Sequence, residues 1–165
     1  MARFWKAGLI VAAALLATAG LVSIASASSG PNRTASSSKT KTIHVVQSNL
    51  GVDNPVDVGP EGGSVGDYNV INTPFLDPKS NQQVGLESGV CTSIEAPPGR
   101  LQCVTTASFP EGNITFQGAF LFELPKPFVL AITGGTGAYR TAHGTVTFIF
   151  PPRGDELHVV FRVIL

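Results

Sequence analysis

The chain has 165 residues, of which 43% are hydrophobic and 13% are charged, and its formal net charge is zero. This length suits one small domain, and the apolar content excludes a fully disordered chain. The charge is unevenly distributed, because the part from residue 42 onward has six basic and eleven acidic residues, a net charge of −5. An acidic domain lacks the basic surface that nucleic-acid binding requires, so we expect no nucleic-acid partner.

Residues 1–27 are typical of a secretory signal peptide. Two basic residues, Arg3 and Lys6, precede an apolar run over 7–24, and Ala25-Ser26-Ala27 has the small-x-small pattern of a cleavage site. We predict cleavage after Ala27 and secretion, with an N-terminal membrane anchor as the alternative, because such a run is long enough to cross a bilayer. Its high alanine content and the chain's low lysine content favour a bacterial protein.

Residues 28–41 hold no large apolar side chain, so they cannot bury enough surface to offset the entropy of the chain. We predict a flexible tether rich in Ser and Thr over this range. The folded domain is then expected over 42–165.

This domain is predicted to be all-β. It repeats runs of β-branched and aromatic residues separated by Gly, Pro, Asn and Asp, and no useful helical period appears. Alternation of apolar and polar residues within several runs indicates an antiparallel sheet with two unlike faces. Short connections favour a meander, closed as a barrel or packed as a sandwich, and 51–65 is the one long loop. The predicted strands are 43–50, 66–76, 82–94, 101–108, 113–124, 127–134, 143–151 and 156–164.

The chain has two cysteines, Cys91 and Cys103, which we predict to form a disulfide. They flank the turn sequence 95–99, and each lies six residues from Pro97. A hairpin centred on Pro97 places them opposite one another, close enough for a disulfide, and secretion favours oxidation. The spacing is not that of a C-x-x-C redox pair. The histidines show no zinc-ligand spacing, so we expect no metal site; they are His44, His143 and His158.

A glycine-rich segment over 130–137 (LAITGGTG) is followed by Gly144-Thr145-Val146. A phosphate loop needs a lysine and a helix N-terminus, both of which are missing here, so we predict a tight corner between strands. The segment resembles the signature of the allene oxide cyclase family and its dirigent relatives. Three pieces upstream are similar to the same family in the same order: Gly66-Asp67, Gly89-Val90-Cys91 and 112–121 (GNITFQGAFL).

The resemblance implies an eight-stranded antiparallel calycin-like β-barrel, commonly trimeric, with a hydrophobic cavity. Allene oxide cyclases close an unstable fatty-acid epoxide into a cyclopentenone, and dirigent proteins direct the coupling of phenoxy radicals. Both activities depend on a shaped apolar cavity that controls the conformation of a reactive intermediate.

The resemblance also assigns roles to individual residues. Asn72 matches the water-binding asparagine of the cyclases and is our catalytic candidate. Cys91 matches a cysteine on the cavity side, and Asn54-Pro55 stand in for a loop proline. The glutamate on the first strand of the cyclases has no counterpart over 43–49, where Gln47 is polar but is not a carboxylate.

We therefore expect a secreted barrel that binds a small hydrophobic molecule and directs its cyclisation or coupling, without a cofactor. The family signature favours an isomerase, whereas the missing first-strand acid favours a barrel without catalytic activity. The alternative is a non-catalytic barrel, either a lipocalin-type ligand-binding protein or a structural module. The expected ligand-binding residues are Gln47, Asn54, Pro55, Asn72, Phe116, Gln117 and Phe120.

Overall fold

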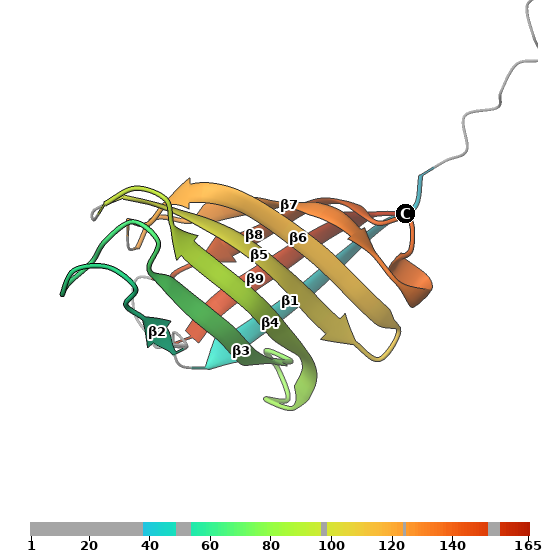
Figure 1. Cartoon of the computed structure of the whole chain (residues 1–165). Helices are drawn as coiled ribbons and strands as arrows, with labels where there is room; N and C mark the ends of the chain where they lie inside the picture. Colours follow the sequence, from blue (N-terminus) through green and yellow to red (C-terminus); the bar gives the residue numbers. More distant parts are fainter. Residues whose placement is uncertain (1–37, 49–53, 97–98, 124, 152–155) are drawn as a thin grey trace, which may run out of the picture. The chain divides into compact units, whose positions relative to one another are not determined.

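A computed structural model describes residues 38–48, 54–96, 99–123, 125–151 and 156–165, all within one compact unit (Figure 1). The predicted signal peptide and residues 28–37 of the predicted tether lie outside these ranges. The tether was expected to end at residue 41, but the first strand already begins at Thr40. Within the described ranges, no helix is long and apolar enough to span a membrane.

The described residues form strands in all eight predicted places, with one short strand and one short 3-10 helix in addition. The short strand, Pro55–Val56, lies in the segment predicted as a loop, because two residues are too few to show a period. The elements in chain order are β1 (Thr40–Ser48), β2 (Pro55–Val56), β3 (Tyr68–Leu76), β4 (Gln83–Ser93), β5 (Arg100–Phe109), β6 (Gly112–Leu121), β7 (Phe128–Gly135), η1 (Gly137–Tyr139), β8 (His143–Ile149) and β9 (Glu156–Ile164).

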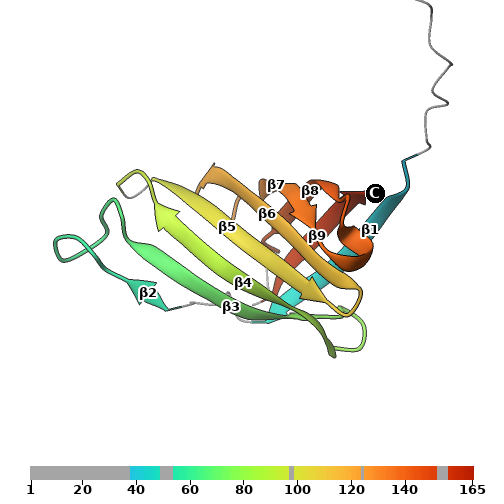
Figure 2. The same ribbon diagram turned by 45° about the vertical axis from the view of Figure 1, so that its right-hand side comes forward.

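The strands close into an antiparallel barrel. Their order is β1-β9-β8-β7-β6-β5-β4-β3, and β1 pairs with β3 through Val46 and Leu76, which completes the ring. β2 extends the sheet beside β3 at Tyr68 and Asn69. Figure 2 shows the curvature of the sheet from a second side. The eight-stranded barrel is therefore confirmed, and the sandwich is excluded.

Alternation along the strands determines which side chains fill the barrel. On β9, Leu157, Val159, Phe161 and Val163 are all buried, as the sequence predicted, while Glu156 and Arg162 are exposed. Burial of large apolar side chains of this kind contributes about 1.5–3 kcal/mol each. The barrel core is therefore a major source of its stability.

The predicted disulfide is present and faces the interior of the barrel. Cys91 of β4 and Cys103 of β5 are paired directly across the strands, with their Cα atoms 4.0 Å apart, and both are buried. The hairpin register deduced from the turn over 95–99 is thus confirmed.

The glycine-rich segment forms a tight corner between β7 and β8, as predicted. Gly137 has a φ of +59°, a conformation that glycine adopts without strain, and it starts the helix η1. This turn carries Tyr139 into the core, where only 1% of its surface is exposed. Its ring packs near Phe109, with the two centroids 6.2 Å apart.

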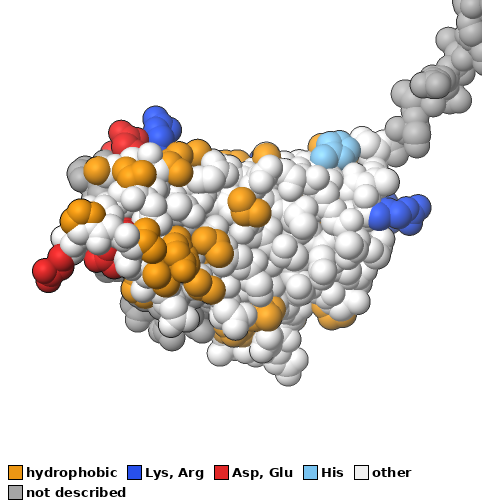
Figure 3. Space-filling model, in the orientation of Figure 1, with side chains coloured by type: hydrophobic (Ala, Val, Ile, Leu, Met, Phe, Trp, Pro, Cys, Tyr) orange, Lys and Arg blue, Asp and Glu red, His pale blue; other side chains and the backbone are white. Residues whose placement is uncertain are grey.

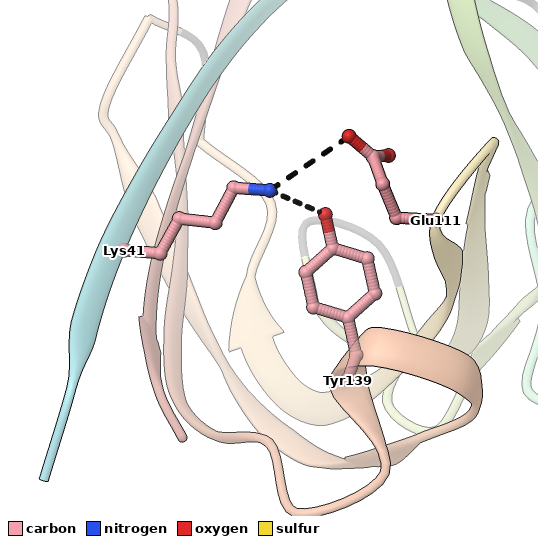
Figure 4. Close-up of polar contacts among 3 residues, drawn as sticks. All are labelled: Lys41, Glu111 and Tyr139. Atoms are coloured by element: carbon pink, nitrogen blue, oxygen red, sulfur yellow. Dashed lines mark hydrogen bonds and ion pairs between the residues drawn. The ribbon is translucent and has the colours of Figure 1, made fainter.

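Lys41 links this corner to the first strand (Figure 4). Its Nζ donates a hydrogen bond of 2.9 Å to Tyr139 Oη and lies 4.0 Å from a carboxylate oxygen of Glu111, in the turn between β5 and β6. The hydrogen bond to Tyr139 raises the pKa of Lys41, and Glu111 adds to this effect. The contacts therefore join β1, η1 and the β5–β6 turn.

Candidate active site

Four polar side chains face the interior of the barrel, and we call them the interior polar group. Each comes from a different strand, and together they occupy the adjacent strands β1, β3, β4 and β5. All are at most 5% exposed. Burying a polar group costs free energy unless it is hydrogen-bonded, and burying a charge costs much more. The members of the interior polar group are Gln47, Thr73, Glu87 and Thr105.

A hydrogen bond between Gln47 and Glu87 is the central contact of the group. The side-chain amide of Gln47 donates to Glu87 Oε2 at 2.6 Å, and both side chains are buried. The strand register places Glu87 directly beside Thr73 of β3 and Ala107 of β5. The carboxylate therefore lies in the middle of the barrel wall, away from both ends of its strand.

Thr105 lies on β5, two residues before Ala107, the residue paired with Glu87. Its hydroxyl donates a hydrogen bond of 3.3 Å to the backbone carbonyl of Phe116. Its methyl group packs against Gly89, the residue paired with it on β4, where an added Cβ would approach Thr105 Cγ2 to 2.6 Å. Gly89 is thus required by the close approach of the two strands, and it leaves this part of the wall without a side chain.

The opposite wall of the barrel, formed by β6 to β9, is apolar and rich in aromatic rings. Phe120, Phe128 and Phe148 stack in sequence, with centroids 3.7 Å and 4.6 Å apart. Phe116 meets the edge of Phe161 at 5.6 Å. Phe75 of β3 and Phe109 of β5 meet the edge of Phe161 at 5.7 Å and 5.6 Å, so aromatic rings from both walls pack together in the interior.

This arrangement can perform acid–base chemistry on an apolar molecule. The amide of Gln47 donates to one oxygen of Glu87 and so helps to orient its carboxyl group, a group that can act as a general acid or base. Exclusion of water strengthens the electrostatic effect of such a group on a bound molecule. The phenylalanines provide a surface for rings or alkyl chains.

Only some of the residues predicted to bind a ligand face the interior of the barrel. Gln47, Phe116 and Phe120 face the interior and are buried. Gln117 is exposed on the outer face of β6, because it alternates with Phe116. Asn72 is likewise exposed on the outer face of β3, where it accepts a hydrogen bond from Ser88 Oγ at 3.4 Å. Thr73, the next residue, takes the inward position.

Asn54 and Pro55 lie at the rim of the barrel, outside its interior. Both are exposed, and the backbone of Asn54 accepts a hydrogen bond from Val70 N. Pro55 and Tyr68 line a surface pocket of about 160 Å³. Asp67 lies beside it, and hydrogen bonds from the backbone of Ser64 and Val58 lower the pKa of its carboxyl group.

Sequence reasoning missed Glu87, the buried acid. The family resemblance points to an acid on the first strand, whereas the structure brings Glu87 of β4 to Gln47 of β1. A usable signal was present, because Glu87 lies four residues before Cys91 and strand alternation places both on the same face. Over the described ranges, no three His, Cys, Asp or Glu residues come together as a metal site.

Comparison with known proteins agrees with this architecture. Residues 44–160 match the profile of the family described as the allene oxide cyclase barrel like domain. Pterocarpan synthase 1 from Glycyrrhiza echinata is 31% identical over 102 residues, which cover 58% of this chain and 44% of that protein. The chain thus matches less than half of the length of this relative.

Solved structures share the same barrel. Pyocyanin demethylase is 27% identical, with a TM-score of 0.62 over 75% of this chain and 99% of that one. The pterocarpan synthase dirigent protein GePTS1 is 22% identical, with a TM-score of 0.61 over 77% and 84%. The Diels–Alderase AbmU from Streptomyces koyangensis is 19% identical, with a TM-score of 0.61 over 79% and 71%. Together with the match over 44–160, the closed barrel and its glycine-rich corner show that this chain belongs to the allene oxide cyclase barrel-like family.

Proposed function

We propose that the protein is an exported barrel enzyme that binds a small hydrophobic molecule and directs its cyclisation or coupling, with Glu87 as the proton-transfer group. The observation that carries this proposal is the hydrogen bond between Gln47 and Glu87 inside a largely apolar barrel. A buried carboxylate is costly for folding, so its presence favours a chemical role over a structural one. The barrel provides the orientation of the substrate, and Glu87 provides the acid–base step.

The more similar relatives support an enzymatic role. Pterocarpan synthase 1 and pyocyanin demethylase, at 31% and 27% identity, are both enzymes by name. The proposed site in this chain combines Gln47 and Glu87 with the inward-facing rings of Phe116 and Phe120. Export is supported by the Cys91–Cys103 disulfide, because such bonds persist in oxidising compartments.

A non-catalytic barrel is the second candidate, and the packing of the interior favours it. Phe75, Phe116 and Phe161 are completely buried, and Phe75 and Phe116 each contact Phe161 edge-on. A barrel filled in this way by its own side chains would serve as a structural module. The two candidates differ in whether a small molecule enters the interior.

A binding experiment tests whether a small molecule enters the interior. The probe is N-phenyl-1-naphthylamine, a neutral apolar molecule whose fluorescence rises in apolar surroundings. We expect saturable binding of about one probe per chain. Leu101→Trp, at a partly buried position packed against the core, should weaken binding roughly tenfold, equivalent to about 1.4 kcal/mol, by filling the interior. Leu121→Trp is the matched control, because Leu121 is exposed on the outer face and its replacement should leave binding unchanged.

Absence of a saturable fluorescence increase in the wild-type protein would favour the filled barrel over the enzyme. Equal binding by Leu101→Trp and Leu121→Trp would place the probe on the outer surface and contradict binding in the interior. Circular dichroism and thermal melting of both variants establish that each is folded before binding is compared.

We also propose that the barrel assembles as a homotrimer through a row of valines on its outer face. Val70, Val90 and Val104 are aligned directly across β3, β4 and β5, and are 37%, 38% and 57% exposed. Figure 3 shows hydrophobic side chains gathered on the face that these strands present. Contiguous apolar surface of this kind is typical of protein–protein contacts, and the trimer itself is what the family resemblance implies.

Val104→Glu is expected to convert the trimer into monomers. A carboxylate buried in the contact would raise the dissociation constant by about a hundredfold or more, because its desolvation costs about 3 kcal/mol. Size-exclusion chromatography with light scattering measures the mass directly. Val58→Glu is the control, since Val58 has the same exposure but lies in the loop before β3. A wild-type monomer, or a trimer that persists in Val104→Glu, would contradict the proposed contact.

A further inference from the structure

Two histidines lie together on the outer face of the barrel, away from the interior polar group. His44 is on β1 and His158 is on the adjacent antiparallel strand β9. His44 is paired with Val160, and His158 is paired with Val46, so the two imidazoles are diagonal neighbours. His44 Nε2 and His158 Nδ1 are 3.0 Å apart, and the rings stack with centroids 5.2 Å apart.

We propose that His44 and His158 form a surface site for a divalent transition-metal cation such as Zn²⁺. Imidazole nitrogens bind Zn²⁺ at about 2.0–2.1 Å, so two adjacent nitrogens on one ion lie roughly 3 Å apart. The separation of Nε2 and Nδ1 in the structure is of this size. Small rotations of the two exposed rings then direct both lone pairs at one ion, without movement of the strands.

The backbone beneath the two rings is well suited to hold them. Val45 and Val159, which follow the histidines on their strands, are buried at 1% and 0% exposure, and they anchor β1 and β9 in the core. The ring positions are therefore pre-organised by the sheet rather than by a mobile loop. Pre-organisation reduces the entropy lost when the second nitrogen binds.

Charges on the same face of β9 define the surroundings of the site. Glu156 and Arg162 are exposed on either side of His158, at two and four residues along the strand. The described residues thus provide two imidazole ligands, and the remaining coordination positions are open to water. Imidazole ligands suit Zn²⁺, Cu²⁺ and Ni²⁺ better than Mg²⁺ or Ca²⁺, which prefer oxygen.

Titration of the purified, tag-free protein with ZnCl₂ by isothermal calorimetry tests the site. We expect about one Zn²⁺ per chain. His44→Ala and His158→Ala should each weaken binding by more than about tenfold, the smallest loss typical for residues that merely support a metal ligand. His143→Ala is the matched control, because His143 is also exposed but lies on β8, where its ring contacts the carbonyl of Thr141.

A second readout separates metal binding from folding. Nitrogen chemical shifts of the histidine rings should change on addition of Zn²⁺ for His44 and His158 but not for His143, and the metal-free melting temperatures of the variants should agree. Absence of saturable binding in the wild-type protein would overturn the proposal, as would unchanged binding in His44→Ala. Because both rings face outward, neither result depends on the role of Glu87.

Discussion

Glu87→Gln should lower the rate of substrate conversion by about 10²–10⁴-fold, the usual contribution of a positioned general acid or base. The replacement keeps the size and the hydrogen-bonding capacity of the side chain but removes its ability to exchange a proton. Gln47 Nε2 now donates to Glu87 at 2.6 Å and can donate to an amide oxygen in its place. The barrel should therefore fold normally, and substrate binding should be retained.

The assay follows conversion of a small molecule selected by its ability to displace N-phenyl-1-naphthylamine. Glu61→Gln, an exposed loop position, is the matched control and should retain full activity. Urea denaturation gives the free energy of unfolding, which should be equal or higher in Glu87→Gln because a buried carboxylate has been removed. Undiminished conversion by Glu87→Gln would refute the catalytic role, and a large loss of stability would instead assign the residue to the framework.

Removal of the disulfide should cost about 3 kcal/mol of stability. The two cysteines are separated by 12 residues, and closure of a loop of this size restricts the unfolded chain by about this amount. Replacement of both Cys91 and Cys103 by serine also places two hydroxyls in the buried wall. The melting temperature is expected to fall by roughly 10 °C.

Reduction of the wild-type protein provides the control for this variant. Dithiothreitol should lower the melting temperature of the wild-type barrel toward that of the double serine variant, and it should leave the variant itself unchanged. A wild-type melting temperature that is insensitive to complete reduction would show that the disulfide does not stabilise the barrel.

Local sequence determined the strands, because alternation is a property of neighbouring residues. For example, the alternation of Leu157, Val159 and Phe161 with mostly polar neighbours predicts a buried face without knowledge of the partner strands. The disulfide could also be predicted from local sequence, because a hairpin centred at Pro97 pairs Cys91 directly with Cys103. The glycine-rich corner indicated the family, although its role in carrying Tyr139 into the core required the structure.

The same alternation also constrains which residues can face the interior. Phe116 and Gln117 are consecutive residues of one strand, so they cannot both face the interior, and the more apolar residue takes that side. On β3, by contrast, the pattern is ambiguous, because Val70 and Asn72 on one face are no more polar as a pair than Ile71 and Thr73 on the other. Thr73 faces inward because of the way β3 pairs with its neighbours in the closed barrel.

By itself, then, the sequence determined an all-β domain, its strand positions, its disulfide and its family. Closure of the barrel decided which residues form the site. Gln47 and Glu87 are 40 residues apart and lie on strands that are not sequential, so no local period relates them. Their contact exists because β1 pairs with β3 and curvature directs both side chains inward, where the cost of burying each polar group is offset by the other.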